Sequence, residues 1–132
     1  MDLQQALSGI KVVAVTRVVA APFAAYQLAL HGADVITVED PREGDSMRVA
    51  HEFESEFLRQ KMARVFLAFN SNKRSMTLRF DAPEGREVFG RLARDADVVI
   101  ENLKGGTMAR FGIGYQDLKK INPRIIFASI TG

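Results

Sequence analysis

The chain contains no cysteine, which excludes disulfide scaffolds, zinc–thiolate sites and a thiol nucleophile. It also lacks any apolar run close to the ~20 residues of a membrane-spanning helix, and its first residues lack the basic and apolar regions of a secretory signal. Its two histidines, His31 and His51, form no spacing typical of a metal site or of a catalytic triad. We therefore expect a cytoplasmic protein that binds no metal and does not enter a membrane.

The charge is spread unevenly, with a net of −2 in residues 1–40 and +4 in residues 41–132, but the sequence contains no run of like charge. The 18 Lys and Arg residues are interleaved with 16 Asp and Glu residues, a pattern typical of solvated surface. This distribution indicates that nucleic acid is not a partner. The 132 residues, of which 47% are hydrophobic, are enough for one domain with its own core.

Glycine is absent from residues 16–22, which follow the first β-branched run of the sequence. A dinucleotide-binding fingerprint requires glycines at this place, because the backbone must approach a pyrophosphate closely. No P-loop pattern occurs in the chain. Although Glu39 occupies the place of a ribose-binding acid, the sequence argues against a dinucleotide site.

Five short runs rich in apolar or β-branched residues predict β-strands. Runs of this kind, nearly continuous in apolar character, are typical of parallel strands that are covered on both faces. The predicted strands are Lys11–Val15, Asp34–Glu39, 75–80, 97–101 and 124–130.

The segments between these runs predict helices. Pro22 suits a first helical turn and Gly32 follows the end of that helix, while Asp81 and Glu84 have the spacing of a capping box with Asp81 as N-cap. The predicted helices are 22–31, 51–69 (one helix, or a helix and a loop), 82–95, 107–111 with Thr107 as its cap, and Tyr115–Ile121. Regular alternation of this kind predicts an α/β fold, with a Rossmann-like, doubly wound, mostly parallel sheet and helices on both faces.

Ligands of such sheets bind outside the carboxyl ends of the strands. The loop at residues 101–110 follows a predicted strand and contains two glycines before a helix start, where free N–H groups attract phosphate. Lys104 and Arg110 would neutralise that charge, although a plain glycine turn with two surface bases is an equal interpretation. For the basic loops at 42–48 and 70–75, an ordinary solvated loop is the favoured interpretation.

Seven segments in order resemble the beginning of class III CoA-transferases, the CaiB/BaiF family that also contains α-methylacyl-CoA racemases. The similarity extends from about Leu7 to Gly132, so residues 1–132 resemble an amino-terminal, CoA-binding part of the family's large domain. The segments are 7–13 with 16–18, 32–36 with 38–39, 44–48, 72–78, 83–86, 96–102 and 122–126.

The resemblance implies coenzyme A as the ligand, with an acyl-CoA and a free carboxylic acid as substrates and an interlocked homodimer as the assembly. CoA would be transferred through an aspartate that forms an acyl anhydride and then a CoA thioester. That aspartate is expected beyond residue 132, so no catalytic residue is assigned here. Two alternatives stay open: an acyl-CoA racemase of the same family, and a non-catalytic nucleotide-binding or assembly module.

The resemblance also implies which residues contact CoA. They match positions beside the thioester, the adenosine, the nucleotide loop and the phosphates of CoA. In that order they are Val19 and Ala20; Leu78 and Asp81; Asn102, Leu103 and Lys104; and Arg110, with Arg42 as an additional cation.

Three positions depart from the family pattern. Asp81 stands where the family often has lysine, and Asp40 stands where some members have arginine, so that Arg42 is expected to take over that contact. Val19 stands where one transferase subgroup has glutamine, which argues against membership of that subgroup.

Overall fold

The computed structural model describes residues 5–50 and 56–131. At its centre lies a sheet of five parallel strands in the spatial order β3-β2-β1-β4-β5. The chain reverses its direction of winding between β1 and β4, as Rossmann-type sheets do. The strands are β1 (Lys11–Val15), β2 (Asp34–Glu39), β3 (Arg74–Thr77), β4 (Val98–Glu101) and β5 (Ile126–Ser129).

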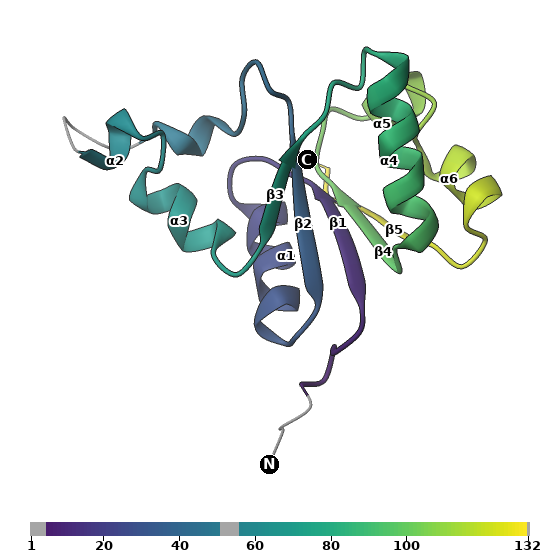
Figure 1. Cartoon of the computed structure of the whole chain (residues 1–132), viewed down its shortest axis with the longest axis horizontal. Helices are drawn as coiled ribbons and strands as arrows, with labels where there is room; N and C mark the ends of the chain where they lie inside the picture. The colour runs from purple at the N-terminus through teal and green to yellow at the C-terminus, as the bar shows by residue number, and fades with distance from the viewer. Residues whose placement is uncertain (1–4, 51–55, 132) are drawn as a thin grey trace.

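Helices cover both faces of this sheet, which confirms the predicted fold class (Figure 1). One face carries α1 and α3, and the other carries α4, α5 and α6. No helix among the described residues is long and apolar enough to cross a bilayer. The helices are α1 (Ala20–Leu30), the 3-10 helix η1 (Ser46–Arg48), α2 (Glu56–Arg59), α3 (Arg64–Asn70), α4 (Pro83–Asp95), α5 (Thr107–Arg110) and α6 (Tyr115–Ile121).

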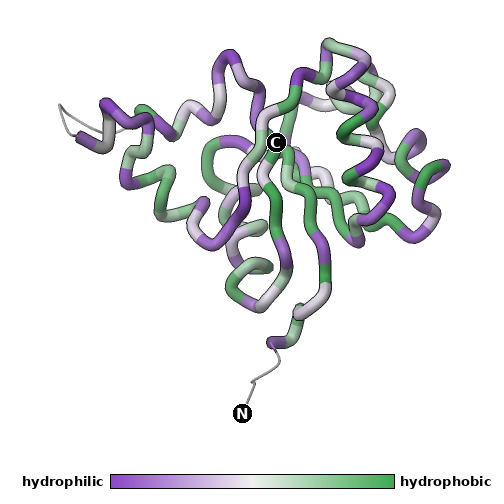
Figure 2. The backbone as a smooth tube through the Cα atoms, in the orientation of Figure 1, coloured by the Kyte–Doolittle hydropathy of each residue, from purple (hydrophilic) through white to green (hydrophobic). Residues whose placement is uncertain are grey.

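Alternate residues of each central strand enter two separate cores. On β1, Val13 and Val15 pack in the same cluster as the fully buried Phe89 of α4, whereas Val12 and Ala14 pack with the alanines of α1. Figure 2 shows the resulting concentration of hydrophobic residues along the central strands. Small side chains on α1 allow that helix to approach the sheet closely. Both layers therefore fix the carboxyl ends of β1, β2 and β4 relative to one another.

The structure corrects several predicted element boundaries. The third strand ends at Thr77 rather than at residue 80, and the first turn of α4 packs against the backbone of Arg79 just beyond it. Helix α1 begins at Ala20, before the predicted start. The predicted helix 51–69 is divided into α2 and α3, with Lys61 in a left-handed conformation between them. Residues 51–55, including His51, lie outside the described residues.

The predicted caps of two helices are also wrong. Ala82, not Asp81, is the N-cap of α4 and its side chain forms no capping bond; the Asp81 carboxylate instead forms ion pairs with Arg42 and Arg79. Because its carboxylate is held by two guanidinium groups, Asp81 does not cap the helix. The cap of α5 is Gly106 in a left-handed conformation, so Thr107 is its first residue. The left-handed Gly32 and the bounds of α6 are confirmed.

Candidate functional site

A cleft of about 300 Å³ opens at the carboxyl edge of the sheet, where β1, β2 and β4 end. The position is the one where open α/β sheets bind ligands, at the reversal of strand order. Its size suits part of a large ligand rather than the whole of one. The cleft is lined by Val15, Thr16, Arg17, Val38, Glu39, Asp40, Arg42, Gly44, Phe80, Asp81, Leu103, Lys104, Thr107 and Phe111.

Four of the nine expected contact residues meet in this cleft: Arg42, Asp81, Leu103 and Lys104. They come from three loops that lie far apart in the sequence and follow β2, β3 and β4. Lys104 is exposed, and within residues 5–50 and 56–131 it forms no ion pair. Its ammonium group is therefore available to an anion that enters the cleft. Glu101, buried at the end of β4, accepts the Leu103 N–H at 2.8 Å and so fixes the start of this loop.

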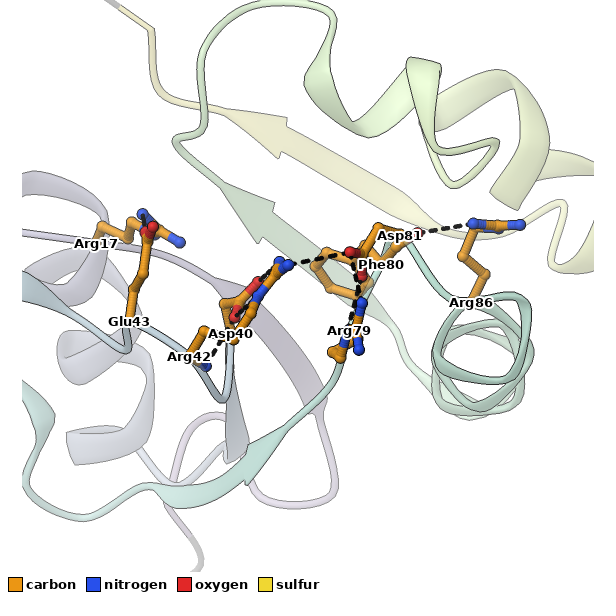
Figure 3. Close-up of polar contacts among 8 residues, drawn as sticks. All are labelled: Arg17, Asp40, Arg42, Glu43, Arg79, Phe80, Asp81 and Arg86. Atoms are coloured by element: carbon orange, nitrogen blue, oxygen red, sulfur yellow. Dashed lines mark hydrogen bonds and ion pairs between the residues drawn. The ribbon is translucent and has the colours of Figure 1, made fainter.

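Arg42 is engaged by two carboxylates at the mouth of the cleft (Figure 3). Its Nη2 lies 2.5 Å from Oδ2 of Asp40, and its Nη1 lies 3.1 Å from Oδ2 of Asp81, which also pairs with Arg79 at 2.9 Å. The hydrogen bonds from Arg42 hold the pKa of Asp40 at about 2 and raise the pKa of Arg42 itself. An anionic ligand must therefore compete with two ionised carboxylates for this guanidinium.

The other expected residues lie outside the lining. Arg110 is exposed and its Nη2 donates to Oγ1 of Thr107 at 3.1 Å, so it reaches the cleft only through that residue. Leu78 packs against the core instead. The helix that was expected to attract phosphate, α5, has only four residues, and a single turn provides little of a helix dipole. Lys104 is therefore the group in this loop that can attract an anion.

The loop after β1 contributes Thr16 and Arg17 to the cleft. The side-chain amide of Asn102 binds both sides of the Arg17 backbone: Oδ1 accepts the N–H at 2.8 Å and Nδ2 donates to the carbonyl at 2.9 Å. Asn102 thus joins the ends of β1 and β4. Val19 and Ala20 follow as the cap and first residue of α1, with exposed side chains.

Thr16 is a candidate contact that the sequence did not reveal. The residue is 2% exposed, and its Oγ1 has no hydrogen-bond partner among the residues that the structure describes. A buried hydroxyl without a partner costs about 1–3 kcal/mol. Because Thr16 also lines the cleft, a bound polar group that reaches the hydroxyl would recover part of that energy.

A second group of polar residues, of which Glu39 also lines the cleft, holds the loop after β2. The Arg48 guanidinium binds Glu39 through two bonds, at 2.8 and 2.6 Å, and Glu39 also accepts the Asp45 N–H at 2.9 Å. Burial acts to raise the pKa of Glu39, but Arg48 and the Asp45 N–H together keep that pKa below its ordinary value. Glu39 is therefore an ionised carboxylate with a structural role. Its position in the sequence is that of a ribose-binding acid, but its contacts are those of an internal ion pair.

The loop at 70–75 is largely exposed, as predicted, but its Lys73 is anchored in the scaffold. Lys73 is half-buried, and its Nζ donates to the carbonyl oxygens of Pro22 at 2.8 Å and Phe69 at 2.7 Å. Burial lowers the pKa of Lys73 to about 8. These bonds connect the end of α3 to the first turn of α1, so the lysine supports the scaffold beside the cleft. Among the described residues, no group of three or more His, Asp or Glu residues is placed to hold a metal ion.

Comparison with known proteins decides the family. The sequence model described as CoA-transferase family III matches residues 7–132. The chain belongs to this family. That membership agrees with the five-stranded parallel sheet and with the cleft at its carboxyl edge.

Relatives within CoA-transferase family III are similar along nearly the whole chain. An acyl-CoA transferase of Fusarium pseudograminearum is 46% identical, over 98% of this chain and 29% of its own length. A succinate–glutarate CoA-transferase of Agrobacterium fabrum is 44% identical, over 96% of this chain and 32% of its own length. The crystal structure of a CaiB/BaiF family protein from Brucella suis has a TM-score of 0.87 and 43% identity, over 98% of this chain and 34% of that one. The chain thus spans about a third of the length of these relatives.

Proposed function

We propose that this protein takes part in the transfer of coenzyme A between carboxylic acids and that the cleft holds an anionic part of CoA. In such a reaction the carbon–sulfur bond of the donor thioester is broken and a new one forms to the acceptor acyl group. The acceptor carboxylate loses one oxygen, and the donor acyl group gains one and leaves as a carboxylate. The observation that carries the proposal is the cleft of a family III chain, which contains an unpaired lysine, Lys104, and a buried hydroxyl without a partner, Thr16.

Three cations have different roles in this proposal. Lys104 contacts a phosphate group directly, because no carboxylate among the described residues engages it. Arg42 contributes by exchanging its bond to Asp81 for one to the ligand, and this exposed ion pair is weak enough to be replaced. Arg110 joins the site when its side chain leaves Thr107. The remaining expected contacts, Val19, Ala20, Leu78, Asn102 and Leu103, are assigned to CoA by the resemblance.

Substitution of Lys104 by alanine is expected to weaken CoA binding about tenfold, which is the loss of one charge-assisted contact of ~1.4 kcal/mol. Arg110→Ala is expected to have a smaller effect in the same direction. Isothermal titration with CoA at constant pH and salt measures both. Lys119→Ala and Arg94→Ala remove the same charges from exposed positions outside the cleft and serve as controls. An unchanged affinity in Lys104→Ala would show that the anion binds elsewhere.

The activity is tested with succinyl-CoA and labelled glutarate, because the relative from Agrobacterium fabrum is named for succinate and glutarate. The resemblance implies a catalytic aspartate beyond residue 132, so we expect residues 1–132 alone to give no turnover. With a chain that includes that aspartate, we expect label to appear in glutaryl-CoA, with an equal amount of succinate released. Release of the free thiol without a new thioester would indicate hydrolysis instead of transfer. Exchange of an α-proton with solvent, without movement of CoA, would favour the racemase alternative.

We also propose that the protein acts as a homodimer in the cytoplasm. The resemblance to the CaiB/BaiF family supports the dimer, and the absence of disulfide chemistry from the cysteine-free sequence agrees with a reducing compartment. Sedimentation equilibrium of the protein measures the assembly directly.

A further inference from the structure

The loop between β1 and α1 contains a strained residue. Val18 has φ of 69°, in the left-handed region that β-branched side chains rarely adopt. Glycine would adopt this conformation freely, yet residues 16–19 contain none. A conformation of this kind persists only where the surrounding structure determines it.

Asp45 supplies that support. Both of its carboxylate oxygens lie 3.2 Å from the Val18 nitrogen, and Oδ1 also accepts the Met47 N–H at 3.0 Å. The Asp45 residue is 3% exposed, so water does not compete for these bonds. Its own N–H donates to Glu39, which is fixed in turn by Arg48. The carboxylate is therefore held by the end of β2 while it binds the loop that follows β1.

The same loop is held from its other side. Asn102, after β4, binds the backbone of Arg17 through two hydrogen bonds. Arg17 and Thr16 both line the cleft, directly before the strained residue. Residues that follow β2 and β4 thus both bind the short loop after β1. The shape of that loop determines part of the cleft wall.

We propose that Asp45 is a positioning residue for ligand binding. It holds residues 16–19 in their strained conformation and thereby places Thr16 and Arg17 against a ligand in the cleft. A loop that is ordered before the ligand arrives spares the binding step the loss of entropy that ordering would require. The inference rests on the proposed binding of CoA in this cleft.

The test compares three variants: Asp45→Ala, Asp45→Asn and the double variant Asp45→Ala with Val18→Gly. Asp45→Ala is expected to weaken CoA binding about tenfold in titration calorimetry, and Asp45→Asn less than about threefold because its Oδ1 still accepts both N–H groups. The double variant is expected to recover most of the loss, since glycine adopts the left-handed conformation without support. If Asp45 were needed only for folding, the loss of affinity in Asp45→Ala would disappear once binding is referred to the folded fraction measured by circular dichroism.

Asp97→Ala is the matched control, because Asp97 also accepts a backbone N–H, that of Lys11, at the opposite end of β1. It is expected to leave CoA affinity unchanged. If Asp45→Ala folds and binds CoA as tightly as the wild type, or if the double variant recovers nothing, the inference is overturned.

Hydrogen exchange of the Val18 amide in the absence of ligand separates this inference from the proposed function. Asp45→Ala is expected to accelerate that exchange at least about tenfold, while Asp97→Ala leaves it unchanged. If the exchange is accelerated in Asp45→Ala but the wild type does not bind CoA, the proposed function is contradicted. The role of Asp45 in holding residues 16–19 would then still stand. An unchanged exchange rate would refute the role of Asp45 whatever the ligand.

Discussion

Replacing Gly85 with alanine is expected to lower the free energy of unfolding by about 3 kcal/mol, the upper part of the range for an overpacked core. A Cβ at this position would lie 2.0 Å from the carbonyl oxygen of Arg79 and 2.8 Å from its carbonyl carbon. Both are backbone atoms, so no side chain can rotate away. Urea denaturation of the protein at constant pH measures the change.

Gly90→Ala is the control within the same helix. Its Cβ would meet Ile121 Cδ1 at 3.6 Å, an ordinary contact, so alanine is expected to stabilise the protein by about 0.5–1 kcal/mol through its higher helix propensity. Equal effects of the two substitutions would show that α4 does not press on the turn at Arg79. Because Phe80 and Asp81 follow that turn into the cleft wall, Gly85→Ala is also expected to weaken CoA binding.

Arg48→Ala is expected to destabilise the protein by about 3–5 kcal/mol, because it leaves a buried carboxylate without its cation. The Glu39 side chain is only 5% exposed, and the Arg48 guanidinium lies 3.9 Å from the centre of the Phe66 ring. The substitution therefore removes a doubly bonded ion pair and a stacking contact together. Arg74→Ala, which breaks the exposed pair with Asp34, is the control and is expected to cost less than about 1 kcal/mol.

The pH dependence of the Arg48→Ala effect has a defined sign. In the wild type the pKa of Glu39 lies below its ordinary value of 4.5, so this carboxylate stabilises the fold above pH 4.5 and loses that contribution as the pH falls through the lowered pKa. Without Arg48, burial raises the pKa of Glu39, and stability is then lost as the pH rises through the raised value. Denaturation at pH 4 and pH 7 should show a smaller difference between variant and wild type at pH 4.

The sequence predicted the layered fold because its signals are local. Each β-branched run, such as Lys11–Val15, and each amphipathic segment, such as Tyr115–Ile121, carries its own period, and alternation then leaves few possible topologies. Element ends were less predictable, because they depend on packing between distant segments. The third strand ends where Gly85 approaches Arg79, a contact that no local pattern contains.

The sequence predicted those residues of the candidate site whose position depends on one loop alone. Lys104 follows a strand end directly, so its place at the carboxyl edge could be derived from the sequence. Asp81 had the spacing of a helix cap, but its carboxylate pairs with Arg42, which lies 39 residues earlier in the chain. Asp45 was missed for the same reason, since Val18 lies 27 residues away. A contact between residues that follow different strands produces no local pattern that can be recognised in a single sequence.

The balance of charge in the cleft wall determines how a ligand finds the site. Positive and negative side chains are equal in number along the lining, three of each: Arg17, Arg42 and Lys104 against Glu39, Asp40 and Asp81. Such a wall projects little net field into solvent, so a polyanion is not steered toward it over long distances. Selection then takes place after encounter, through local exchange of partners, and the association rate should vary only weakly with ionic strength.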